Sequence, residues 1–191
     1  MASAFTHAFF AAAMGKVYAV GPQPARFWPL SMFCAVLPDA DVLGFAFGVH
    51  YDSMFGHRGL THSLAFALLL SCAVVALFFR DAPNKRALAA YFFLVTASHG
   101  ALDALTNGGL GVAFFAPFSG ERYFFPFRPV EVSPIGLGSF FSEWGVAVIK
   151  SELLWVWLPS ALAVVIVLSL RRLRGRGERA ARGEGAGKSW T

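Results

Sequence analysis

Seven histidine and aspartate side chains could bind divalent metal, because imidazole and carboxylate groups are the usual protein ligands of such ions. They are His7, Asp39, Asp41, His57, His62, His99 and Asp103. A catalytic zinc ion uses about three protein ligands and keeps one position for water. Seven residues exceed one such site and suit two ions about 3.5–4 Å apart, unless some only orient a ligating imidazole. We predict one or two divalent ions, Zn²⁺ or alternatively Mn²⁺.

The spacing of these residues is compatible with convergence. His99 and Asp103 are four positions apart, so a helix places both on one face. Asp39 and Asp41 follow Pro38 and point the same way if the backbone there is extended or turn-like. In the motif HRGLTHS, residues 57–63, we expect Thr61 to cap the following helix.

Other charged roles follow from position. Arg58, next to His57, is predicted to hold an anionic substrate group or to pair with Asp39 or Asp41. A carboxylate of Asp39, Asp41 or Asp103 that is not used in ligation is a candidate general base. The simpler alternatives are a hydrogen-bonding membrane histidine, a capped helix break at Asp39 and a buried ion pair between His99 and Asp103.

Composition predicts that helices in a membrane position these residues. Hydrophobic residues form 57% of the 191-residue chain and charged residues 14%, against about 25% charged in soluble domains. We expect an all-α, polytopic membrane helix bundle with about five spanning segments. Five apolar stretches carry this prediction: residues 3–20, 27–49, 61–79, 87–105 and 153–170.

The basic residues predict how the bundle is oriented. With five spans, twelve of the sixteen Lys and Arg residues fall on one side, and this side should be cytoplasmic. The N-terminus then lies outside and the C-terminus inside. On this topology all seven candidate ligands fall near the outer face, although none of them was used in the count.

We expect two parts in the chain. Residues 1–170 form the membrane-embedded domain, within which the Gly-, Pro- and Phe-rich stretch 106–152 forms an aromatic extracytoplasmic cap or a re-entrant segment. Residues 171–191 form a basic, disordered cytoplasmic tail.

Four elements together resemble a known family. They are His7 in the first apolar segment, LPDAD at 37–41, HRGLTHS at 57–63 and SHGALDALTNGG at 98–109. In this order they are similar to the inner-membrane metal-dependent hydrolases, a family also described as LexA-binding. PFSGERYFFP at 117–126 resembles a downstream motif of that family. The resemblance implies an inner-membrane location, the seven-residue metal site with Arg58 beside it, and LexA as a partner.

Metal-assisted hydrolysis at the outer face of the cytoplasmic membrane is the predicted function. A site at the lipid–water boundary favours an amphiphilic, phosphate-containing substrate and membrane lipid as a partner, and we expect no nucleic acid partner. The alternatives are a non-catalytic metal-binding protein or transporter, and a regulatory membrane protein acting through its basic tail.

Overall fold

Helices make up the regular structure of residues 1–181, the part of the chain that the computed structural model describes. The helices are α1 (Ala4–Tyr18), α2 (Phe27–Val36), η1 (Leu37–Phe47), η2 (Leu60–His62), α3 (Leu64–Phe78), α4 (Lys85–Ala104), α5 (Leu137–Phe140), α6 (Glu143–Glu152), η3 (Leu153–Trp157) and α7 (Leu158–Ala181). This part of the chain forms no strand, only two isolated bridges. The expected all-α class is confirmed.

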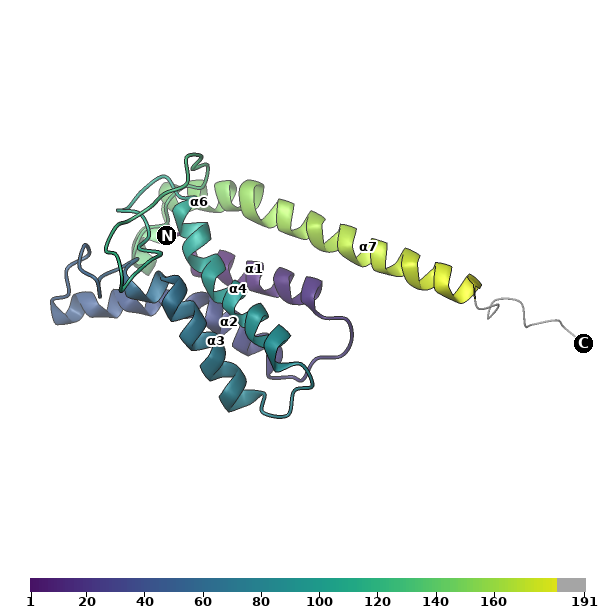
Figure 1. Cartoon of the computed structure of the whole chain (residues 1–191). Helices are drawn as coiled ribbons and strands as arrows, with labels where there is room; N and C mark the ends of the chain where they lie inside the picture. The colour runs from purple at the N-terminus through teal and green to yellow at the C-terminus, as the bar shows by residue number, and fades with distance from the viewer. Residues whose placement is uncertain (182–191) are drawn as a thin grey trace, which may run out of the picture.

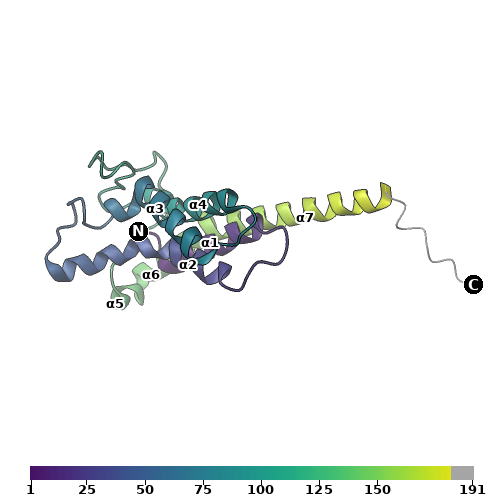
Figure 2. The ribbon, with the colours of Figure 1, turned by 60° about the horizontal axis from the view of Figure 1, so that its bottom comes forward.

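Helices α1 to α4 form a four-helix bundle, and α7 lies along α1 (Figures 1 and 2). The core of the bundle is apolar and aromatic, with Phe27, Phe92 and Val95 fully buried. The Tyr91 hydroxyl makes polar contacts across it, to Ser31 Oγ at 2.9 Å and to the Ala11 carbonyl oxygen at 3.5 Å. Burying these faces against one another fixes the relative positions of the four helices, and the candidate ligands lie on α1, on α4 and on the segment between α2 and α3.

Three helical stretches are long and apolar enough to cross a membrane: Phe27–Phe47, Lys85–Ala104 and Glu143–Arg176. Helix α3 is a shorter apolar helix of 15 residues, and α1 also has 15. The five predicted segments therefore coincide with five helical stretches. The number of spans and the orientation of the termini stay predictions.

The candidate ligands lie at one end of the bundle, and Arg26 and Arg171 lie at the other. His7 is near the start of α1 and Asp103 near the end of α4, whereas the guanidinium of Arg26 stacks on Phe79 at the other end, 5.2 Å from the ring centroid. The side chain of Arg171 donates to the carbonyl oxygens of Val17 and Ala19, where α1 ends. This separation agrees with the predicted placement of the site on the less basic face.

The chain after α4 differs in part from expectation. Within the expected cap 106–152, the first part is irregular and held by the bridges Thr106–Val130 and Val112–Tyr123, but α5 and α6 lie in its second part. Helix α6 runs through the π-helical turn η3 into α7, so the last apolar segment is one long rod (Figure 1). The rod continues to Ala181, past the expected start of a disordered tail, because Leu and Arg are good helix formers. The tail prediction for residues 182–191 lies outside the described residues.

Candidate metal centre

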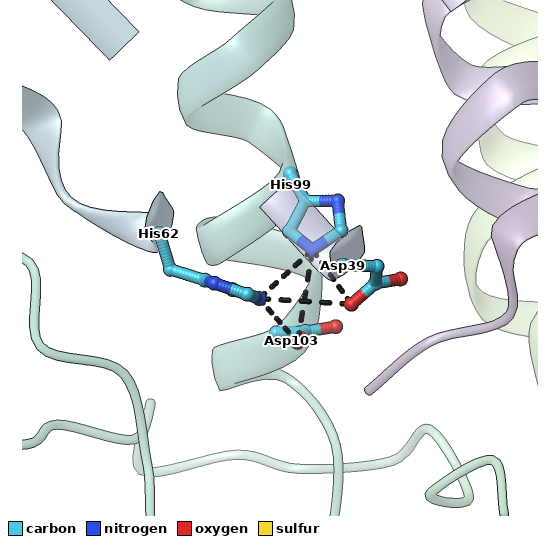
Figure 3. A group of neighbouring side chains, drawn as sticks. All are labelled: Asp39, His62, His99 and Asp103. Atoms are coloured by element: carbon cyan, nitrogen blue, oxygen red, sulfur yellow. Dashed lines mark hydrogen bonds and ion pairs between the residues drawn. The ribbon is translucent and has the colours of Figure 1, made fainter. Parts of the chain in front are cut away.

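Four side chains from three parts of the bundle converge at the end of α4. Figure 3 shows Asp39, His62, His99 and Asp103 pointing toward one common point. The Nε2 atoms of His62 and His99 are 3.0 Å apart, and those two atoms lie 3.7 and 3.3 Å from Asp39 Oδ1. Asp103 Oδ2 is 3.5 Å from His62 Nε2 and 4.0 Å from His99 Nε2. All four residues are buried.

These separations are compatible with a metal-coordination shell. Zinc binds imidazole nitrogen and carboxylate oxygen at about 2.0–2.2 Å, which places neighbouring ligand atoms of a tetrahedron roughly 3.3–3.6 Å apart. The five measured separations, 3.0 to 4.0 Å, bracket that range. A divalent ion at the centre therefore needs only small adjustments of the side chains.

The buried polar atoms of the cluster also call for a cation. Among the described residues no hydrogen-bond partner is found for Asp39 Oδ1 and Oδ2, for Asp103 Oδ2 or for the two ring nitrogens of His7. Buried polar atoms without partners are rare because desolvating them is costly. A bound divalent ion would give the oxygens of Asp39 a partner and would share Asp103 Oδ2 with Arg58, so the donor set fits a divalent metal.

Local backbone structure explains how α4 and the η2 turn come together. His99 and Asp103 lie one helical turn apart on the buried face of α4, as their spacing predicts. Gly100 lies against the η2 turn, and a Cβ there would be 2.9 Å from the carbonyl oxygen of His62. Only glycine allows this approach, which brings His62 over the end of α4.

The hydrogen bond of His99 to the protein fixes which nitrogen faces the cluster. His99 Nδ1 lies 2.6 Å from the carbonyl oxygen of Ala35, which can only accept a proton. In neutral His99 the proton is therefore on Nδ1, and the Nε2 lone pair points at the ligand atoms.

Asp41 orients neighbouring groups. Its Oδ1 lies 2.7 Å from His57 Nδ1, and its Oδ2 accepts from Thr61 Oγ1 at 2.8 Å and from the backbone N–H of Arg58 at 3.2 Å. The same Oδ2 lies 3.2 Å from His62 Nδ1, which leaves His62 Nε2 for the ion. Asp41, His57 and His62 also form a second group whose ligand atoms lie within 4.8 Å of one another. Because His62 joins both groups, its contact with Asp41 favours an orienting role for this carboxylate.

The stretch containing Asp39 and Asp41 was expected to be extended or turn-like with both side chains pointing the same way, and they do not point the same way. Residues Leu37–Phe47 form the 3₁₀ helix η1, with Pro38 in its first turn. In this conformation Asp39 turns toward His99 while Asp41 turns toward His57, so the two carboxylates serve different neighbours.

Arg58 is completely buried and surrounded by protein groups. Its Nε lies 3.2 Å from Asp103 Oδ2, Nη1 donates to the Gly108 carbonyl oxygen at 2.8 Å, and Nη2 donates to Thr106 Oγ1 at 3.0 Å. Its φ of 63° is unusual for a residue with a side chain and indicates local strain. This geometry indicates that Arg58 holds Asp103 in place. From the sequence we expected Arg58 to hold an anionic substrate group or to pair with Asp39 or Asp41.

His7 lies against the cluster on the side of α1. Its ring stacks on that of His99 with centroids 3.7 Å apart, and its Nε2 is 3.4 Å from Asp103 Oδ1. The same Oδ1 accepts the backbone N–H of Ala2 at 2.7 Å. One oxygen of Asp103 therefore faces the four-residue cluster and the other faces α1.

The charge state of His62 follows from its surroundings. Three carboxylates surround its ring: Nε2 lies 3.7 Å from Asp39 Oδ1 and 3.5 Å from Asp103 Oδ2, and Nδ1 lies 3.2 Å from Asp41 Oδ2, which favours the charged form of the ring. Nearby, burial raises the pKa of Tyr51 and lowers that of Arg122. Arg122 donates to the carbonyl oxygens of His57, Tyr51 and Ser53, so it closes the loop that carries His57.

Comparison with known proteins places the chain in a family. Residues 1–174 match the family model described as YdjM inner membrane protein. The chain is 39% identical over 176 residues to inner membrane protein YbcI of Escherichia coli (strain K12), an alignment that covers 90% of this chain and 100% of that protein. This chain belongs to the YdjM inner membrane protein family. No solved structure matches it.

Membership of the YdjM family confirms the resemblance seen in the motifs and the inner-membrane location.

Some contacts around the centre of this YdjM family protein were not expected. Ser63, not Thr61, caps α3 by accepting the backbone N–H of Phe66, while Thr61 binds Asp41. Glu152 is buried against α1. Its only signal in the sequence is an acidic residue directly before the apolar run LLWVWL.

Proposed function

We propose that this protein is a membrane-bound, metal-dependent hydrolase whose His/Asp centre lies at the outer face of the inner membrane. The observation that carries the proposal is the convergence of Asp39, His62 and His99 with Asp103, at ligand spacing and with unpartnered carboxylate oxygens. A bound divalent ion would act as a Lewis acid and lower the pKa of a water molecule towards about 7.

The chain's own residues divide the remaining tasks. Asp41 and Arg58 are engaged by surrounding protein groups, and they hold His62 and Asp103 in place. Asp39 has no hydrogen-bond partner on either oxygen among the described residues, so one oxygen can bind the ion while the other accepts a proton. Asp39 is therefore the best placed of the three predicted general bases.

An apolar groove beside the centre supports a substrate with an acyl chain. The groove has a volume of about 760 Å³ and lies between α3, α4 and the segment Phe114–Phe118. Leu64, two residues after His62, lines the groove, and its N–H donates to the carbonyl oxygen of Phe114, which also lines it, at 3.0 Å. Ser71 is the one hydroxyl in the lining, and it donates to the Leu68 carbonyl oxygen. An amphiphile with a phosphoester head group at the centre and an apolar chain in the groove fits this arrangement.

A transporter is less well supported. A carrier needs polar groups leading from the site to both faces of the membrane. Beneath the centre the described part of the bundle is filled by buried apolar residues such as Ala35, Phe92 and Val95. LexA binding stays a prediction from the family resemblance.

Detergent-purified protein would test the proposal directly. Metal per chain is counted by elemental analysis, and hydrolysis of a panel of phosphoesters and lipids is measured with Zn²⁺ or Mn²⁺. We expect His62→Ala to lose both metal and turnover, and His50→Ala, a loop histidine outside the cluster, to keep both. Equal turnover in wild type and His62→Ala would rule out the proposed site.

A further inference from the structure

Glu152 is a buried carboxylate that the proposed reaction does not use. It is the last residue of α6, only 2% exposed, and lies where the rod passes the start of α1. A carboxylate buried in an apolar helix of a membrane protein is costly and usually has a defined task.

Both oxygens of Glu152 bind the first turn of α1. Oε1 accepts the backbone N–H of Ser3 at 2.5 Å, and Oε2 accepts the hydroxyl groups of Ser3 at 2.7 Å and Thr6 at 2.9 Å. Trp157, one turn further along the rod, donates its indole N–H to Thr6 Oγ1 at 2.7 Å. The negative charge also lies at the positive end of the α1 dipole. Glu152 therefore fixes the start of α1 against the rod.

The segment that Glu152 fixes also contacts the metal centre. The peptide N–H of Ala2, directly before that of Ser3, donates to Asp103 Oδ1 at 2.7 Å. His7, directly after Thr6, stacks on His99. A shift of the first turn of α1 would therefore move the Ala2 N–H that donates to Asp103. It would also move the His7 ring that stacks on His99.

We infer that Glu152 is a positioning residue of the metal centre: through the first turn of α1 it sets the orientation of Asp103 and the position of His7. The inference rests on the proposed metal centre but not on hydrolysis. Partners that orient ligands in this way typically change metal affinity by about 10–100-fold when removed.

The other end of the same helix pair provides a matched control. Arg171, on α7, donates to the carbonyl oxygens of Val17 and Ala19 and so fixes the end of α1. Like Glu152, it joins the rod to α1 with a charge that suits the helix dipole, but at the end of α1 away from the ligands. Loss of Arg171 should loosen the helix pair without moving Asp103 or His7.

The experiment compares Glu152→Gln and Arg171→Gln in the purified full chain. Zn²⁺ affinity is measured by competition with a chromophoric chelator, the ligand geometry by the visible spectrum of the Co²⁺-loaded protein, and stability by thermal unfolding. We expect both variants to lower Tm, but only Glu152→Gln to weaken Zn²⁺ binding, by about tenfold or more, and to change the Co²⁺ spectrum. Thr6→Val, which removes one hydroxyl at nearly constant volume, should give a smaller change of the same kind.

The outcomes separate the two proposals. If Glu152→Gln has the same Zn²⁺ affinity and Co²⁺ spectrum as Arg171→Gln, Glu152 only stabilises the packing of α1 on the rod. This result would overturn the inference. If Glu152→Gln does not fold, Thr6→Val decides by the same two measurements. A wild type that binds Zn²⁺ without hydrolysing any substrate removes the proposed function and leaves this comparison intact. A wild type that binds no divalent metal overturns the inference as well.

Discussion

The Nε2 atoms of His62 and His99 lie 3.0 Å apart in the interior of the bundle. Two imidazole lone pairs cannot face each other at this distance, so a hydrogen atom or a cation must lie between the two nitrogens. Since His99 donates its Nδ1 proton to Ala35, this is either a proton on His62 Nε2, which then donates to His99 Nε2, or a metal ion. The same space is thus open to either a proton or a divalent cation.

Metal binding should therefore release a proton from His62. Three carboxylates surround the ring of His62, and they favour its doubly protonated, charged form in the metal-free protein. Ligation requires the neutral ring, so affinity should rise with pH, by up to about tenfold per unit while the ring is protonated. Zn²⁺ competition titrations at pH 6, 7 and 8 measure the slope, and calorimetry in buffers of different ionisation enthalpy counts the protons. A dissociation constant that does not change with pH would contradict the geometry.

Asp39 and Asp41 should behave differently when substituted, although they are two positions apart. Asp39 offers unpartnered oxygens to the ion, so Asp39→Ala should abolish stoichiometric metal binding. Asp41 orients His57 and His62, so Asp41→Asn should weaken binding by about 10–100-fold and still allow loading at high Zn²⁺. Metal content and affinity of the two purified variants check this order. The reverse order would make Asp41 the ligand and assign the ion to the group of Asp41, His57 and His62.

Arg58 provides a test between positioning and substrate binding. Lysine keeps the charge but cannot contact Asp103, Thr106 and Gly108 together. Arg58→Lys should therefore lower both Tm and Zn²⁺ affinity, because Asp103 loses a buried partner. If Arg58 instead holds the anionic group of a substrate, Tm and Zn²⁺ affinity stay near the wild-type values and only KM rises. Thermal unfolding, metal titration and kinetics on the same preparation separate the two roles.

The groove should affect only substrates with a long chain. Ala65 lines it, and Ala65→Trp should fill part of its volume. We expect kcat/KM to fall about tenfold or more for a long-chain phosphoester in vesicles and to change less than twofold for a short, water-soluble one. Ala76→Trp, an exposed position on the same helix outside the groove, is the control. Equal losses for both substrates would mean that Ala65→Trp disturbs the neighbouring η2 turn and not an acyl site.

Local spacing predicted much of the candidate site. The four-residue interval between His99 and Asp103 and the apolar pattern of α4 were sufficient to place both side chains on one buried face. Convergence of His7, Asp39 and His62 on that face also agreed with the ends of the apolar segments at which they lie.

The roles of individual residues depended on contacts that spacing does not encode. Pro38 was compatible with an extended strand or a 3₁₀ helix, and the packing of Asp39 on His99 selects the helix. The side chain of Arg58 points inward because it donates hydrogen bonds to Thr106 and Gly108. These residues lie about fifty positions later in the sequence. Glu152 reaches Ser3 across a separation of 149 residues, and no local pattern predicts such a pair.

The rod from Glu143 to Arg176 has 34 residues, which is about 50 Å of helix, whereas the hydrocarbon core of a bilayer is about 30 Å thick. A helix longer than that core adapts by tilting or by leaving its ends in the headgroup regions. Because Glu152 joins this rod to the turn that touches Asp103, changes in tilt act on the ligands through a short, stiff connection. Lipid chain length and detergent choice are therefore experimental variables for every metal measurement on this protein.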